Sequence, residues 1–124
     1  MDLWISNSGG VPIYEQIVNQ IKGLVLSGAL KEGDTLPSMR LLAKELHISV
    51  ITTKRAYEEL EREGFIVSIT GKGSYVAYVD VSLVREQQLR EVETLLQQAA
   101  EKARIFGIPQ DELIEMLHLQ YLEE

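Results

Sequence analysis

The chain has 124 residues and a formal net charge of −7, with 45% apolar and 25% charged residues, the composition of a folded globular domain. It contains no cysteine, which excludes disulfides and thiolate metal sites. No stretch approaches the roughly 18 uninterrupted apolar residues of a membrane span. The opening MDLWISNSGG lacks the charged start and apolar core of an export signal, so we expect a cytoplasmic protein.

The acidic charge is concentrated in the last third of the chain. Residues 1–79 hold 8 Lys or Arg and 9 Asp or Glu, whereas residues 80–124 hold 4 and 10. Net acidity alone argues against a nucleic-acid partner, but the near-neutral front segment can still carry a basic face. We therefore expect one domain at 1–79 and an appended module at 80–124.

The front domain is predicted to open with a helix between Pro12 and Gly28. Proline suits a first helical turn and glycine suits a C-terminal stop. Apolar residues between them recur every three or four positions, as on the buried face of a helix: Ile13, Ile17, Ile21 and Leu24. Residues 29–37 break this pattern with glycine and proline, and we expect a connecting loop there.

Two further helices are predicted, joined by a tight turn at residues 47–49. The second helix has Ser38 as its N-cap and three leucines facing inward: Leu41, Leu42 and Leu46. The third helix has Ser49 as its N-cap and ends at Gly64. One face of the third helix is expected to be buried: Thr53, Ala56, Tyr57 and Leu60.

A β-hairpin is predicted after the third helix. FIVSIT at 65–70 and SYVAYV at 74–79 are rich in β-branched and aromatic residues, and they flank the glycines of GKG. The order of three helices and a hairpin is that of a winged helix-turn-helix, in which the third helix projects into a groove of a duplex. The predicted fold class is therefore mostly α with a small β-hairpin.

Residues 80–124 are predicted to form an α-helical hairpin that GIP at 107–109 interrupts. A stripe with heptad-like spacing runs along residues 82–106. A hairpin this short has little core of its own, so it must bury the stripe on the front domain, on a second copy, or on both. We favour a second copy, with a dimer interface built from Leu89, Val92, Leu96, Ala99, Phe106, Leu117 and Tyr121.

The sequence offers little support for an enzyme. Neither His47 nor His118 belongs to a Ser–His–Asp order, and the glutamates at 58–63 look like a solvated helix face. GKG lacks the spacing of a phosphate-binding P-loop. We expect no metal ion and no other cofactor.

Candidate nucleic-acid contacts fall at the three places where a winged helix touches a duplex. These are the start of the second helix, whose free N–H groups favour phosphate, the first turns of the third helix, and the tip of the wing. No acidic residue occurs at 47–56. The candidate residues are Ser38, Arg40, Ser49, Val50, Ile51, Thr52, Lys54, Arg55, Gly71, Lys72 and Gly73.

Residues 11–79 resemble the DNA-binding domain of GntR-type bacterial transcription regulators. LPSMRLLAKEL, TTKRAYEELEREGFI and GKGSYV match the family's Pro-Ser-x-Arg, Leu-Ala, Ala-Tyr-x-x-Leu-x-x-x-Gly and Gly-x-Gly motifs. The short tail resembles that of the YtrA-type subfamily, with its two-helix dimerisation module. The resemblance implies DNA contacts from Arg40, Thr52, Lys54 and the wing tip at 71–73.

Val50 and Ile51 depart from that family, whose members often place Arg or Asn just after the residue equivalent to Ser49. Either apolar side chain would suit a thymine methyl group, the apolar feature of a major groove. Alternatively, Ile51 tucks inward and Val50 fills space. The sequence leaves both arrangements open.

The sequence therefore predicts a homodimeric, sequence-specific DNA-binding transcription regulator, acting as a repressor. The helix at 49–64 and the wing at 70–74 would bind an inverted repeat with half-sites about one helical turn apart. A winged helix that binds only other proteins is the alternative, because the fold alone does not prove DNA binding. The sequence identifies no small-molecule effector, because the tail shows no polar cluster within an apolar shell.

Overall fold

The computed structural model describes residues 1–122, which form two compact units, one spanning Met1–Val84 and the other beginning at Arg85. The division lies after the predicted boundary at 79, because Val79 and Val84 both pack against the core of the first unit. Residues 123 and 124, which end the predicted module, lie outside the described residues.

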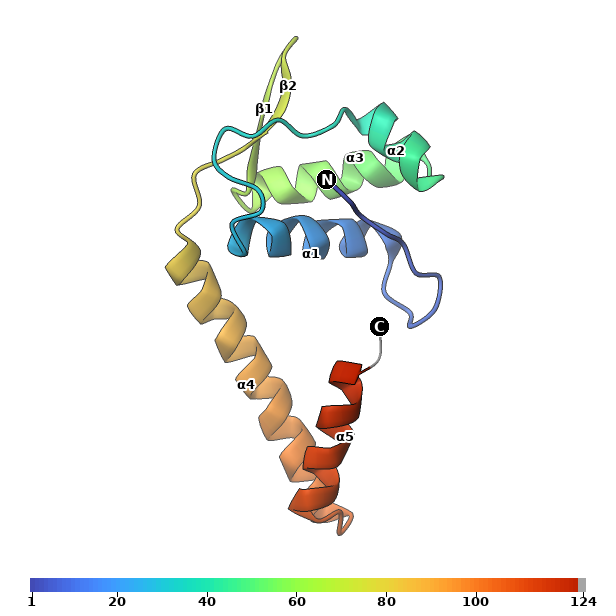
Figure 1. The fold of residues 1–124 in the computed structure, drawn as a ribbon, viewed down its shortest axis with the longest axis vertical. Coiled ribbons are helices and arrows are strands. Elements are labelled where there is room, and N and C mark those ends of the chain that lie inside the picture. The colour runs from blue at the N-terminus through green and yellow to red at the C-terminus, as the bar shows by residue number, and fades with distance from the viewer. Residues whose placement is uncertain (123–124) are drawn as a thin grey trace. The chain divides into compact units, whose positions relative to one another are not determined.

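The first unit has the predicted winged helix-turn-helix fold (Figure 1). Its elements are α1 (Ile13–Leu26), α2 (Met39–Leu46), α3 (Val50–Arg62), β1 (Ile66–Ile69) and β2 (Gly73–Val76). The two strands pair antiparallel, with Ile66 opposite Val76 and Ile69 opposite Gly73. The third helix contacts α1, α2 and β1, so it holds the unit together.

The core of the first unit joins side chains from all of these elements. Every residue predicted for the buried face of α3 is at most 1% exposed: Thr53, Ala56, Tyr57 and Leu60. The three apolar residues among them pack with Ile17 and Ile21 of α1 and with Leu42 of α2. Burying each large aliphatic side chain contributes about 1.5–3 kcal/mol, so this cluster fixes the position of α3.

One prediction of an inward-facing leucine is wrong. Leu41 is 47% exposed, and Ala43 takes the buried position beside Leu42. In α1, Leu24 is partly buried at the predicted helical spacing, and the neighbouring Val25 is fully buried. Adjacent apolar residues satisfy the same helical spacing, so the pattern alone does not decide which of two stripes faces the core.

The ends of α2 and α3 are fixed as predicted. Ser38 Oγ accepts a hydrogen bond from the Leu41 N–H at 3.1 Å, and Ser49 Oγ accepts one from the Thr52 N–H at 3.1 Å. Between the two helices, His47 adopts the left-handed conformation with φ of 56°, which ends α2 in a tight turn.

The connection between α1 and α2 contains a strand-like pairing that the sequence did not predict. Gly33 N–H donates to the carbonyl of Val76 at 2.9 Å, and Leu36 N–H donates to the carbonyl of Ser74 at 3.0 Å. The second strand of the wing is therefore hydrogen-bonded along both edges. The glycine and proline of residues 29–37 indicated a loop, whereas the pairing depends on a partner far away in sequence.

Glutamine side chains hold the N-terminal residues along α1. The amide of Gln16 donates to the Ser6 carbonyl at 2.7 Å and accepts from the Ser6 N–H at 2.8 Å. Gln20 forms the same pair of bonds with Trp4, at 2.7 and 3.1 Å. The two glutamine side chains thus satisfy backbone N–H and C=O groups of Trp4 and Ser6, which would otherwise need a neighbouring strand as hydrogen-bond partner.

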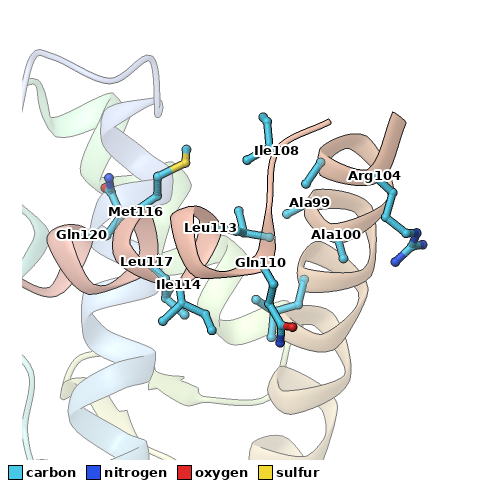
Figure 2. Close-up of a pocket in the computed structure, with 12 residues that line it drawn as sticks. Ala99, Ala100, Arg104, Ile108, Gln110, Leu113, Ile114, Met116, Leu117 and Gln120 are labelled. Atoms are coloured by element: carbon cyan, nitrogen blue, oxygen red, sulfur yellow. The ribbon is translucent and has the colours of Figure 1, made fainter. Parts of the chain in front are cut away.

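A helical hairpin follows, made of α4 (Val81–Ile105) and α5 (Gln110–Leu122), as predicted. Asp80 caps α4 by accepting from the Leu83 N–H at 3.2 Å, and Gly107, with φ of 70°, begins the turn to α5. The facing sides of the two helices form an apolar groove of about 720 Å³, whose labelled residues include Ala99, Leu113 and Leu117 (Figure 2).

The helical hairpin buries little of its own apolar surface. Among its described residues only Ala103 is buried. The large side chains predicted for a dimer interface are between 47% and 80% exposed: Leu89, Val92, Leu96, Phe106, Leu117 and Tyr121. Over residues 1–122, no helix has both the length and the apolar content needed to cross a membrane.

Candidate nucleic-acid interface

The predicted DNA contacts all lie in the first unit, at the start of α2, the start of α3 and the turn of the wing. Arg40, Lys54 and Lys72 are exposed, and none of them belongs to an ion pair within the described chain. Their charges are therefore available to an outside anion such as phosphate.

The apolar pair at the start of α3 points outward. Ile51 is 81% exposed and Val50 is 45% exposed. The alternative in which Ile51 tucks inward is therefore wrong, because the core positions of α3 are taken by other residues, beginning with Thr53. An aliphatic side chain this exposed on a recognition helix is suited to contact with a thymine methyl group.

The hydroxyl groups at the start of α3 form hydrogen bonds within the helix. Ser49 Oγ, which caps the helix, also lies 2.8 Å from Thr52 Oγ1. One hydroxyl of this pair donates to the other, so a single hydroxyl hydrogen remains for an outside acceptor. Ser49 is thus fixed by its capping role, and Thr52 lies one turn into the helix beside it.

Arg55 does not extend freely from α3. Its guanidinium carbon lies 3.8 Å from the centroid of the Tyr14 ring, in the first turn of α1. No sequence pattern predicts this contact, because the two residues are far apart in the chain and Tyr14 also fits the apolar spacing of α1.

The turn of the wing is closed by its own backbone. The N–H of Lys72 donates to the carbonyl of Ile69 at 2.9 Å, and Gly71 and Gly73 have φ of 78° and 105°. Both values lie where side chains with a Cβ are disfavoured, which explains the glycines. Tyr75, which the sequence did not single out, donates its hydroxyl to the Lys72 carbonyl at 3.0 Å and braces the tip.

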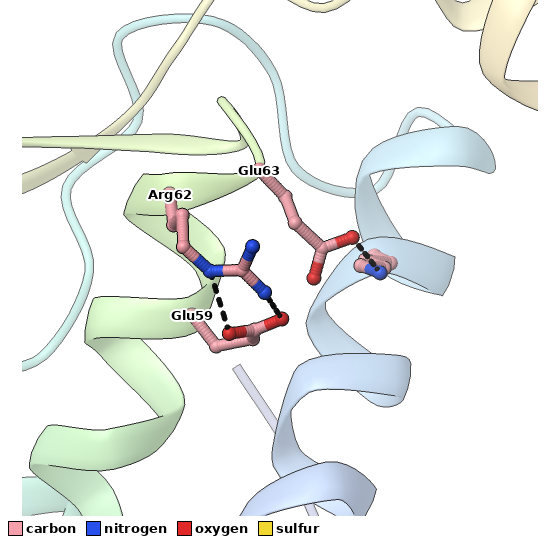
Figure 3. A network of polar contacts seen from close by, with 4 residues as sticks. Glu59, Arg62 and Glu63 are labelled. Carbon is pink, nitrogen blue, oxygen red and sulfur yellow. Dashed lines mark hydrogen bonds and ion pairs between the residues drawn. The ribbon is translucent and has the colours of Figure 1, made fainter.

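The glutamates at the far end of α3 bind neighbouring cations (Figure 3). Glu59 accepts two hydrogen bonds from Arg62, which lower the pKa of the Glu59 carboxyl. Glu63 pairs with Lys22 of α1 at 2.5 Å, and the Lys22 ammonium lies 5.4 Å from the centroid of the Phe65 ring. The Glu63 pair therefore joins the end of α3 to α1, whereas the Glu59–Arg62 pair lies within α3, and both are at the end away from the candidate contacts.

Tyr57 connects α3 to the beginning of α2. Its hydroxyl donates to the carbonyl of Pro37 at 2.7 Å, and burial raises the pKa of this hydroxyl well above its ordinary value. The bond places Ser38 and Arg40, which follow Pro37, at a fixed position relative to α3. Within residues 1–122 there is no cluster of His, Asp or Glu that could hold a metal ion.

Comparison with known proteins agrees with this geometry. Residues 13–76 match the sequence profile of the family described as "Bacterial regulatory proteins, gntR family". The chain belongs to this family. It is 36% identical over 113 residues to the HTH-type transcriptional repressor YtrA of Bacillus subtilis, a match that covers 91% of this chain and 87% of the relative.

Solved structures show the same relationship for this gntR-family chain. A transcriptional antiterminator from Listeria monocytogenes is 32% identical with a TM-score of 0.73, covering 99% of this chain and 91% of its own. YtrA from Sulfolobus acidocaldarius, described as a GntR-family transcription factor, is 37% identical with a TM-score of 0.58, covering 73% and 97%. The gntR-family protein is a DNA-binding transcription regulator and not an enzyme.

Proposed function

We propose that this gntR-family regulator is a cytoplasmic repressor that binds an inverted-repeat operator as a homodimer. Each protomer places the front of α3 in a major groove, while the wing at 70–74 reaches toward the adjacent minor groove. The observation that carries the proposal is the front of α3, where Ile51 is 81% exposed beside cations without ion-pair partners in the described chain. Similarity to a relative named as a repressor favours repression.

Affinity and sequence preference come from different side chains. Arg40, Lys54 and Lys72 bind backbone phosphates, which contribute affinity and fix the register of the protein on the duplex. Val50 and Ile51 contact thymine methyl groups, which differ from one base pair to another. Ser38 and Ser49 support these contacts by capping the helices that carry them.

A second copy of the helical hairpin covers the apolar groove and the exposed stripe of the first. Full burial of a leucine or phenylalanine side chain contributes about 1.5–3 kcal/mol, so covering one that is already half-buried contributes about 1 kcal/mol. The exposed stripe from Leu89 to Tyr121 provides several such contributions against the entropic cost of association. Ala99 lines the groove, and Phe106 follows the end of α4.

Selection of bound sequences from a random DNA pool tests DNA binding and symmetry together. We expect an inverted repeat with thymines facing Val50 or Ile51. Selected sequences that share no motif would contradict the proposal and would favour a winged helix that binds only proteins.

Affinity for the selected operator is then measured against salt concentration. The Arg40→Ala/Lys54→Ala variant removes up to four phosphate contacts from a dimer, so the slope of log K against log salt should fall by about 3 to 4. The matched control is Lys31→Ala/Arg85→Ala, which makes the same change of charge at exposed positions outside the candidate contacts. If both variants bind like the wild type, these phosphate contacts do not exist.

The dimer is tested by ending the chain after residue 84, which keeps Val79 and Val84 on the core they contact. Sedimentation should show a dimer for the full chain and a monomer for the truncated one. In the full chain, the Leu96→Asp/Leu117→Asp variant should also sediment as a monomer, although no residue is deleted. A truncated chain that still sediments as a dimer would refute the assignment of the hairpin.

A further inference from the structure

The contact between Tyr14 and Arg55 has a defined geometry. The guanidinium carbon lies 3.8 Å from the ring centroid, which is the separation of two stacked planar groups. Tyr14 is partly buried against the core of the first unit, so the ring is held in place from behind. Arg55 is exposed, so its side chain remains in contact with solvent although the ring covers part of it.

Stacking leaves the hydrogen-bonding capacity of Arg55 unused. A guanidinium stacks through its face, whereas its five N–H donors point outward in its plane and match the oxygens of a phosphate. Among residues 1–122, the Arg55 side chain forms no hydrogen bond and no ion pair, and the ring of Tyr14 is its one recorded polar or aromatic contact. The stack therefore orients the donors without satisfying them.

The neighbouring acidic residues do not capture Arg55. Glu59 lies four residues further along α3, the usual spacing of a helical ion pair. However, Glu59 accepts hydrogen bonds from both Nε and Nη2 of Arg62 instead. The Arg62–Glu59 pair thus engages this carboxylate, and among residues 1–122 no ion pair involves Arg55, whose charge remains available to an outside anion.

We propose that Tyr14 is a positioning residue, which holds Arg55 in the orientation that binds a backbone phosphate of the operator. This inference rests on the proposed DNA binding, and it extends the interface from α2, α3 and the wing to the first turn of α1. Without the ring, Arg55 would sample many rotamers, and most of them would turn its donors away from the duplex. Lys54 has no aromatic or ion-pair contact within residues 1–122, so it contacts phosphate as a flexible point charge.

The test compares operator affinities of full-length Tyr14→Phe, Tyr14→Leu, Arg55→Ala and the Tyr14→Leu/Arg55→Ala double variant over a range of salt concentrations. Tyr14→Phe keeps the ring and should bind within about twofold of the wild type. Tyr14→Leu removes the ring and should weaken a dimer roughly 5- to 25-fold, because each protomer must then order a mobile Arg55 side chain on binding, at a cost of about 0.5–1 kcal/mol. Arg55→Ala should lower the salt slope by about 2, for two lost phosphate contacts.

The double variant decides between positioning and general stability. We expect it to bind like Arg55→Ala alone, because the ring acts only through the guanidinium. Arg55→Lys covers the case in which Tyr14→Leu does not fold: it keeps the charge but cannot stack as a planar group, so it should bind more weakly than the wild type. If the two single effects add in the double variant, or if Tyr14→Phe is as weak as Tyr14→Leu, Tyr14 does not position Arg55.

These outcomes differ from a failure of the proposed function. If the wild type selects no sequence from the random pool, DNA binding itself is wrong and the inference falls with it. If the wild type binds its operator and Arg55→Lys matches it in affinity and salt slope, only the role of the stack is refuted.

Discussion

Replacing Ile51 by alanine separates its role in the fold from its role in DNA binding. The change removes three carbon atoms, which would cost about 2.4 kcal/mol if the side chain were completely buried in the protein. Because Ile51 is 81% exposed, only about a fifth of that amount applies, and the free energy of unfolding should change by less than about 0.5 kcal/mol.

The same substitution should have a larger effect on the complex with DNA. If thymine methyl groups cover about half of the removed surface, each half-site loses about 1 kcal/mol. A dimer on two half-sites then loses about 2 kcal/mol, roughly a 30-fold increase in Kd. The salt dependence of binding should not change, since no phosphate contact is lost.

The assay is a double-mutant cycle, in which one substitution is made in the protein and one in the operator. Fluorescence anisotropy gives the Kd of wild type and Ile51→Ala for the selected operator and for the same operator with uracil at the facing positions. Uracil lacks only the methyl group, so it should weaken the wild type several-fold and leave Ile51→Ala almost unaffected. Equal losses for both proteins would show that Ile51 does not contact the methyl group. Val50→Ala, at a side chain that is 45% exposed, should alter base preference more than overall affinity.

Three substitutions test the framework behind the interface. Tyr57→Phe leaves the Pro37 carbonyl without its hydrogen bond and should lower the free energy of unfolding by about 1–3 kcal/mol in urea titrations. His47→Gly relieves a left-handed conformation and should raise it by about 0.5–1 kcal/mol, so a loss of stability would show that His47 has contacts of its own. Arg62 lowers the pKa of Glu59 in the folded state. The ionised Glu59 therefore stabilises the fold at any pH above its unfolded-state pKa, and this contribution is lost as the pH falls through its lower folded-state pKa. Glu59→Gln should therefore flatten the acid side of the stability profile, measured by urea midpoints between pH 7 and 3.

Local patterns in the sequence predicted the parts of this fold that depend on local physics. Ser38 and Ser49 were recognisable as caps, since a serine before an apolar helical pattern is a strong start signal. The buried face of α3, from Thr53 to Leu60, was recognisable because only one apolar stripe fits that helix. In α2 two stripes fit, and the predicted Leu41 lies on the exposed one.

Contacts between distant segments were beyond sequence reasoning. The bond from Leu36 to Ser74 and the stack of Arg55 on Tyr14 each join residues that no local pattern links. The orientation of Ile51 was undecided for a related reason, because an isoleucine fits a core or a groove equally well. The candidate site could thus be located from the sequence, but the division of its residues into supporting and contacting groups could not.

Three consecutive residues, 36–38, connect the wing, α3 and α2 of the first unit. Leu36 is hydrogen-bonded to the wing, the Pro37 carbonyl accepts from Tyr57 of α3, and Ser38 caps α2. These bonds set the spacing between the elements that meet the duplex before DNA is bound, so we expect the duplex to adjust its groove width and curvature to that spacing. Base pairs that touch no side chain then influence affinity through their stiffness. We expect the selected operators to favour flexible or narrow-grooved steps between the directly contacted positions.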